Sequence, residues 1–204
     1  MMRELSMHIM DITQNSVRAD ARNVEVRVCE DLRANKLSFS VSDDGCGMSP
    51  ELVEKVRDPF TTSRTTRKVG LGIPMLEQTC LQCGGFLEIS SQVGLGTAIK
   101  AQMDYDNIDR PPLGDMANTI HVLAIMNPDI NLKYIHQYIS ASGQGREYCL
   151  DMAEVKEVLD GLPLDEPSVM EWIKGNIEEG LNGLNIEVPY NSQKENTDTA
   201  YAGS

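Results

Sequence analysis

The sequence contains no long apolar run, and we expect no export signal. A membrane-spanning helix needs about 20 consecutive apolar residues, and no stretch approaches that length. The first residues pass into an amphipathic pattern without the apolar core and cleavage site of a secretory signal. Hydrophobic residues at 41% and charged residues at 24% are ordinary for a globular protein. We therefore predict a cytoplasmic protein whose 204 residues form one medium domain or two small ones.

Paired cysteines and basic charge are also scarce. The five cysteines are an odd number, which argues against a disulfide framework. Cys80 and Cys83 form a C-x-x-C without the second pair that a zinc site needs, so we interpret them as reduced, partly buried thiols. The net charge is −13, and residues 105–204 hold 6 basic against 17 acidic residues. An acidic surface repels phosphate backbones and anionic lipid, so we expect neither nucleic acid nor membrane as a partner. Simple solubility also explains this acidity.

The most informative segment is the turn Asp43-Asp44-Gly45-Cys46-Gly47, which closes an alternating apolar run. A carboxylate fixed there can accept a hydrogen bond from a base or an amide. The glycines permit a tight turn and allow a ligand to approach the backbone closely. The same pattern also describes an ordinary acidic surface turn. Its meaning therefore depends on the segments that flank it.

Residues 3–20, upstream of this turn, have the periodicity of an amphipathic helix. Asp11, Asn15 and Arg18 recur at helical spacing and therefore lie along one polar stripe. A carboxylate, an amide and a guanidinium on successive turns could contact a water, a metal ion and a phosphate. A solvated helix face would produce the same pattern.

Downstream of the turn, residues 58–69 lose their periodicity and are rich in hydroxyl and cationic side chains. This composition suits a mobile lid over phosphates better than a core element. Gly70-Leu71-Gly72 then opens a helix that continues to about Cys83. The free amides and the dipole at the start of such a helix favour a polyphosphate.

The order of the predicted elements defines the fold class, which is α+β. A strand hairpin within residues 24–41 is followed by a helix, the lid, the glycine-led helix and a second hairpin within 86–103. This order predicts an α/β sandwich in which helices cover one face of a mixed sheet.

A break in composition at residues 104–114 divides the chain. We predict one domain over residues 1–104 and a small acidic α+β appendage over 115–185. Residues 188–204 are polar and aperiodic, and we predict that they are disordered.

Four segments in this order resemble the nucleotide site of the GHKL superfamily, which includes gyrase, heat-shock chaperone, histidine kinase and MutL ATPases. They are residues 11–15, 43–47, 58–62 and 70–72. The resemblance covers residues 1–104. It implies the Bergerat fold of a histidine-kinase-like ATP-binding domain, with ATP and Mg²⁺ as cofactors.

The resemblance also implies roles for individual residues. Asn15 would ligate magnesium, Arg18 would reach a phosphate, and Asp43 would pair with the exocyclic amine of adenine. Asp11 stands where hydrolytic members carry the glutamate that activates water. Being one methylene shorter, it would hydrolyse slowly, orient an acceptor hydroxyl, or only hold a water or Arg18. The other residues that the resemblance assigns to the nucleotide are Gly45, Gly47, Phe60, Thr61, Thr62, Arg64, Lys68, Gly70, Leu71, Gly72 and Thr97.

The branch of the superfamily follows from what surrounds the site. A histidine kinase carries a helical hairpin with its phosphoacceptor histidine, usually upstream of the first motif, and here that motif begins at once. We therefore expect a magnesium-dependent signalling kinase or ATPase that acts on a protein partner, similar to anti-sigma-factor kinases. The alternative is a nucleotide-gated binding module with little or no turnover. The partner is not identified by the sequence, and a homodimer is left open.

Overall fold

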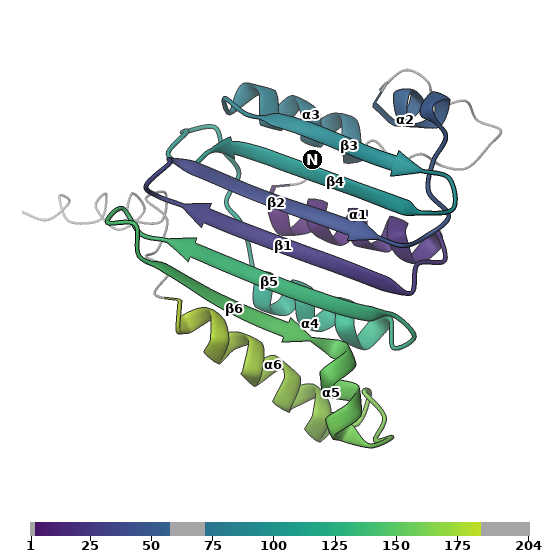
Figure 1. Cartoon of the computed structure of the whole chain (residues 1–204). Helices are drawn as coiled ribbons and strands as arrows, with labels where there is room; N and C mark the ends of the chain where they lie inside the picture. Colours follow the sequence, from purple (N-terminus) through teal and green to yellow (C-terminus); the bar gives the residue numbers. More distant parts are fainter. Residues whose placement is uncertain (1–2, 58–71, 185–204) are drawn as a thin grey trace, which may run out of the picture.

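The computed structural model describes residues 3–57 and 72–184. The strands are β1 (Asn23–Asp31), β2 (Lys36–Asp43), β3 (Phe86–Gln92), β4 (Gly96–Asp104), β5 (Asn131–Ile139) and β6 (Gly145–Asp151). The helices are α1 (Leu5–Arg18), α2 (Pro50–Arg57), α3 (Gly72–Gln82), α4 (Met116–Met126), α5 (Met152–Leu159) and α6 (Pro167–Asn182). The strands form one six-stranded sheet in the order β3-β4-β2-β1-β5-β6 (Figure 1).

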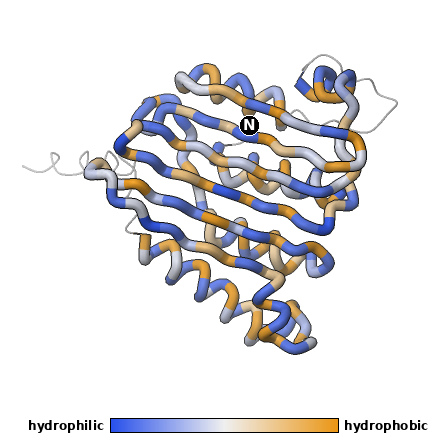
Figure 2. The backbone as a smooth tube through the Cα atoms, in the orientation of Figure 1, coloured by the Kyte–Doolittle hydropathy of each residue, from blue (hydrophilic) through white to orange (hydrophobic). Residues whose placement is uncertain are grey.

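The sheet is mixed. β1 pairs in parallel with β5, whereas the other neighbouring strands pair antiparallel. Apolar and polar residues alternate along the strands, as the tube in Figure 2 shows. On β1, for example, Val24, Val26 and Val28 are buried and the residues between them are partly exposed. This period of two directs one set of side chains toward a core and the other toward solvent.

The helices supply the other half of that core. α1, α3 and α4 lie behind the sheet in Figure 1, and α6 packs against α4 and β6. Leu5, Ile9 and Ile12 recur at helical spacing on α1 and are buried in the same apolar cluster as the strand valines. The predicted fold, a mixed sheet with helices on one face, is confirmed.

The strands of the predicted appendage, residues 115–185, continue the sheet that the strands of residues 1–104 form. β5 pairs with β1 along its whole length, from Asn131 opposite Asn23 to Ile139 opposite Asp31. Side chains of α4, β5 and α6 belong to the same core cluster as those of α1 and β2. The division into residues 1–104 and 115–185 is therefore not a division of the sheet, and it stays a prediction about domains.

A buried polar cluster joins β1 to β5. His136 Nε2 lies 3.1 Å from Glu30 Oε1, and His136 Nδ1 lies 2.7 Å from the Tyr134 hydroxyl. All three residues are buried, and burial raises the pKa of the Tyr134 hydroxyl well above its usual range. Polar groups inside a core need such partners, because each unpaired one costs the free energy of its lost hydration. The cluster thus ties the two strands together through side chains as well as backbone.

Candidate functional site

The helix α1 carries the predicted polar stripe. Arg18 Nη1 donates a hydrogen bond to Asn15 Oδ1 at 3.0 Å, one turn apart on the helix. Arg18 also lies in the last turn of α1, where a cation interacts favourably with the helix dipole. One alternative for Asp11 was that it holds Arg18, but the described side-chain hydrogen bond of Arg18 goes to Asn15.

The same helix meets the start of α3. His8, one turn before Asp11, is buried, and the backbone of Gly72 at the start of α3 is close enough to influence its pKa. Burial lowers the pKa of His8, and the charge of Asp11 and the backbone of Gly72 only partly oppose this effect. The contact brings the first residue of α3, with the free amides of a helix start, next to the stripe on α1.

The carboxylate of Asp43 is held by three donors. Its Oδ2 accepts a 2.6 Å hydrogen bond from the Ser16 hydroxyl of α1. Its Oδ1 accepts from the backbone N–H groups of Gly45 at 3.0 Å and Thr97 at 3.2 Å. The bond to Ser16 places Asp43 against the helix that carries Asn15, the residue before Ser16. Whether Asp43 and Asn15 act on one ligand stays a prediction.

The neighbouring Asp44 has a different task. It accepts hydrogen bonds from the backbone N–H groups of Arg22 and Asn23, both at 2.8 Å, and from Asn23 Nδ2 at 2.6 Å. These bonds, the backbone N–H of Asn23 first, lower the pKa of the Asp44 carboxyl. Asp44 therefore fastens the glycine turn to the start of β1, while Asp43 faces α1.

The glycines of the turn have protein neighbours that require them. Gly47 has φ +64°, and a Cβ there would lie 2.0 Å from the carbonyl oxygen of Gln92. A Cβ on Gly45 would lie 2.7 Å from the carbonyl oxygen of Ala19. Close packing of the turn against β3 and the end of α1 thus explains both glycines. Their predicted contact with the base stays a prediction.

Two serines of this region escaped sequence reasoning. The Ser91 hydroxyl lies 2.9 Å from the Thr97 hydroxyl, accepts from the N–H of Met48 at 2.8 Å and donates to the carbonyl of Gly96 at 3.0 Å. It thereby joins the glycine turn to the β3–β4 turn. Ser16 could have been found, because a hydroxyl on the apolar face of a helix must find a partner when buried.

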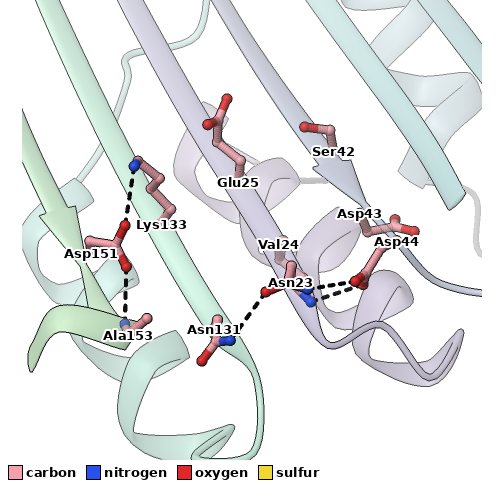
Figure 3. Close-up of a pocket in the computed structure, with 10 residues that line it drawn as sticks. All are labelled: Asn23, Val24, Glu25, Ser42, Asp43, Asp44, Asn131, Lys133, Asp151 and Ala153. Atoms are coloured by element: carbon pink, nitrogen blue, oxygen red, sulfur yellow. Dashed lines mark hydrogen bonds and ion pairs between the residues drawn. The ribbon is translucent and has the colours of Figure 1, made fainter. Parts of the chain in front are cut away.

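A pocket of about 390 Å³ lies at the end of the sheet, beside the glycine turn that contains Asp43 and Asp44 (Figure 3). Glu25 on β1 and Lys133 on β5 stand opposite each other in the strand register and line it. Lys133 Nζ donates to Asp151 Oδ2 at 3.1 Å, and this bond raises the pKa of Lys133. Asp43 and Asp44 of the glycine turn also line the pocket, whereas Asp11 and Asn15 of α1 do not.

The remaining predictions concern metals, membranes and the lid. Within residues 3–57 and 72–184, no group of three or more His, Cys, Asp or Glu residues could hold a metal ion, and no helix is long and apolar enough to cross a membrane.

Cys80 and Cys83 are buried, and burial raises the pKa of the Cys80 thiol to about 12. The predicted lid residues and part of the glycine motif lie outside the described residues, namely Phe60, Thr61, Thr62, Arg64, Lys68, Gly70 and Leu71.

Comparison with known families supports the resemblance to the GHKL superfamily. Residues 3–107 match the HATPase_c family, described as histidine kinase-, DNA gyrase B-, and HSP90-like ATPases. This match takes in half of the chain and all the motifs described above. The chain belongs to this family, and its first region is an ATP-binding domain of the GHKL type.

The relatives of this chain include a sensor kinase and a histidine protein kinase, and both are much longer than the matched segment. Over 89 residues the chain is 36% identical to the sensor kinase CckA of Brucella abortus, which is 43% of this chain and 9% of that protein. Over 105 residues it is 26% identical to the histidine protein kinase DivJ of Caulobacter vibrioides, which is 50% of this chain and 18% of that protein. The chain thus matches only a small part of each.

Among solved structures, the Aquifex aeolicus MutL ATPase domain complexed with ADP aligns with a TM-score of 0.45 at 17% identity, over 78% of this chain and 70% of that one. The N-terminal domain of a DNA repair protein aligns with a TM-score of 0.48 at 15% identity, over 72% of this chain and 52% of that one.

Proposed function

We propose that the chain binds magnesium-ATP between α1, the glycine turn and α3, and acts as a signalling kinase or ATPase on a protein partner. The observation that carries the proposal is the fixed carboxylate of Asp43, which accepts a hydrogen bond from Ser16, the residue after Asn15 on α1. Family membership supports ATP as the ligand. The sensor kinase and the histidine protein kinase among the relatives support a role in signalling.

Asp43 supports recognition of adenine in particular. An ionised carboxylate offers about four lone-pair sites to donors. Ser16, Gly45 and Thr97 occupy three of them, so one acceptor site remains. The exocyclic amine of adenine is a donor and fits that site, whereas the corresponding oxygen of guanine is an acceptor and would be repelled. ATP should therefore bind more tightly than GTP.

Asn15 supports the magnesium assignment. Its side chain is exposed at the end of α1, and its amide oxygen has two lone pairs, of which Arg18 uses one. A neutral oxygen suits a hard cation whose other ligands are phosphate oxygens and water. Bound there, the ion would neutralise phosphate charge. Arg18, the start of α3 and the lid residues Arg64 and Lys68 would add positive potential at the phosphates.

Asp11 is the proposed catalytic residue. It lies one turn before Asn15, beside the buried His8, and is partly exposed on the polar stripe. From there its carboxylate would accept the proton of an attacking water in an ATPase, or of an acceptor hydroxyl in a kinase. A nucleotide-gated module without turnover would use the same residue only to hold a water.

The experiment is incubation of the chain with γ-³²P-ATP and magnesium, alone and with proteins that co-purify with it. Free phosphate indicates an ATPase, label on a co-purified protein indicates a kinase, and ATP binding without either indicates the gated module. Asp11→Asn should abolish turnover but keep ATP binding, and Asn15→Ala should lose both. The control is Glu88→Gln, which removes an exposed carboxylate on β3 and should change neither. Absence of ATP binding at millimolar nucleotide would refute the proposal.

A further inference from the structure

Helices α5 and α6 lie at the sheet edge formed by β6 (Figure 1). An apolar groove lies between these two helices. Its volume is about 240 Å³. We infer that this groove docks a basic amphipathic helix of a partner protein, with apolar side chains in the groove and lysines or arginines over its rim. The residues that line the groove are Val155, Val158, Leu159, Ser168, Val169 and Trp172.

The groove has a buried floor and an uncovered apolar wall. Val155 and Val169 are 8% and 6% exposed and belong to the core. Val158 is 79% exposed and Trp172 51%, and Leu162 in the connection between the helices is 58% exposed. Single exposed apolar residues are ordinary, but a group of large ones around a cavity is typical of an interaction site. Tryptophan is also enriched among the residues that dominate binding energy in interfaces.

The segment that forms the groove, residues 154–179, is acidic, and we call its exposed carboxylates the rim of the groove. Residues 154–179 contain eight carboxylates and two lysines, a net charge of −6. The two lysines are engaged locally: Lys156 Nζ donates to the carbonyl of Ile130 at 2.6 Å, and Lys174 pairs with Glu178 at 3.8 Å. The exposed carboxylates are Glu154, Glu157, Asp160, Asp165, Glu166, Glu171, Glu178 and Glu179.

Such a surface favours one class of occupant over two others. A helix that presents an apolar stripe flanked by basic residues matches an apolar groove with an acidic rim. A second copy of this chain would bring its own acidic surface against this rim. The chain's own residues 185–204 contain three acidic residues and one lysine, so they do not complement the rim either. Charge therefore selects a basic partner.

The position of the groove leaves the nucleotide site free. α5 and α6 pack against β5 and β6, at the opposite end of the strand order from β3, against which α2 and α3 pack. A helix docked between α5 and α6 would not cover the stripe on α1. The inference does not rest on the proposed function, and its test needs no nucleotide.

Trp172 makes the test direct, because it is the single tryptophan of the chain. The full chain without nucleotide is titrated with a synthetic helical peptide that carries a leucine stripe flanked by lysines. We expect a saturable blue shift of tryptophan emission, weakening as salt is added. A matched peptide with glutamate in place of lysine should bind at least about tenfold more weakly. No saturable shift, or equal affinity for both peptides, would overturn the inference.

Variants connect the signal to the groove. Val158→Asp should weaken the lysine peptide at least about tenfold, while Val93→Asp should not, although Val93 in the β3–β4 turn is similarly exposed at 65%. Circular dichroism confirms that each variant is folded. Equal affinity of the two variants would refute the assignment. Two results with the chain alone would also overturn it: a dimer in sedimentation that buries Trp172, or a monomer whose Trp172 is already protected from acrylamide quenching.

Discussion

Replacing Asp43 by asparagine tests the proposed adenine contact with little change in shape. The asparagine can keep its side-chain oxygen toward the N–H groups of Gly45 and Thr97. Its amide nitrogen then replaces the oxygen that accepts from Ser16. A serine hydroxyl can accept as well as donate, so it can turn to accept from that nitrogen. We expect the free energy of unfolding to fall by only about 1 kcal/mol.

The effect on ATP should be larger. In the variant the nitrogen presents donors toward the exocyclic amine of adenine, which is itself a donor. A hydrogen bond to a charged acceptor contributes about 1.5–3 kcal/mol, so its loss corresponds to a decrease in affinity of about 10- to 100-fold. GTP should be affected in the opposite sense, because the same nitrogen can donate to the oxygen of guanine. The preference for ATP over GTP should therefore shrink or reverse.

Isothermal titration calorimetry with ATP and GTP measures both quantities on the same protein. The matched control is Asp44→Asn, which removes the adjacent charge but acts on the bonds to Arg22 and Asn23. That control should lower thermal stability and leave ATP affinity within about twofold. If Asp43→Asn binds ATP as tightly as the natural chain, or if both variants lose affinity equally, Asp43 does not recognise the base.

Three further predictions concern stability, measured by urea unfolding. Gly47→Ala should lower the free energy of unfolding by about 2 kcal/mol or more, because its Cβ would meet a backbone oxygen at 2.0 Å. Gly94→Ala, at φ +78° with nothing within 4 Å, isolates the strain of positive φ; equal losses would contradict the clash. Burial raises the pKa of the Cys80 thiol to about 12, whereas the ordinary value, which applies to the unfolded chain, is 9.0. The protonated thiol therefore stabilises the fold fully below pH 9.0, and this stabilisation is lost as pH rises toward 12. Between pH 8 and 10.5 the natural chain should therefore lose about 2 kcal/mol more than Cys80→Ala, and parallel curves would refute this. Glu30→Ala should lower the free energy of unfolding by about 3 kcal/mol, because the buried His136 Nε2 loses its partner while Nδ1 keeps its bond to Tyr134. Glu25→Ala, half-exposed on the same strand, should cost less than about 1 kcal/mol, and similar costs for the two variants would show that the buried pair adds nothing.

Local chemistry made the individual elements predictable. Asp115 and Asp151 cap α4 and α5 by accepting from backbone N–H groups, and aspartate before a helix is a signal that the sequence shows directly. Pro167 opens α6, and Gly84, with φ +71°, follows the end of α3. These signals act within a few residues, so they can be read from the chain directly. The parallel pairing of β5 with β1 joins segments that are far apart in sequence, and no local signal indicates it.

The candidate site also has one part that local sequence patterns predict and one part that depends on tertiary packing. Helical spacing predicted the stripe of Asp11, Asn15 and Arg18, because residues three and four apart share one face of a helix. The sequence could not show that Asp43 faces Ser16 while Asp44 faces the start of β1. Adjacent residues in a turn point in directions that depend on the tertiary packing around them. The partners of the two aspartates therefore had to come from the structure.

The parallel contact between β1 and β5 also has a consequence during synthesis. Until β5 has been made, β1 presents an unpaired edge of backbone N–H and C=O groups along a valine-rich strand. Exposed edges of this kind invite pairing with other chains. A chain truncated after residue 107, where the family match ends, would keep that edge permanently and should aggregate. During synthesis the risk of such pairing ends only when residue 139 has emerged from the ribosome and β5 can pair with the whole of β1.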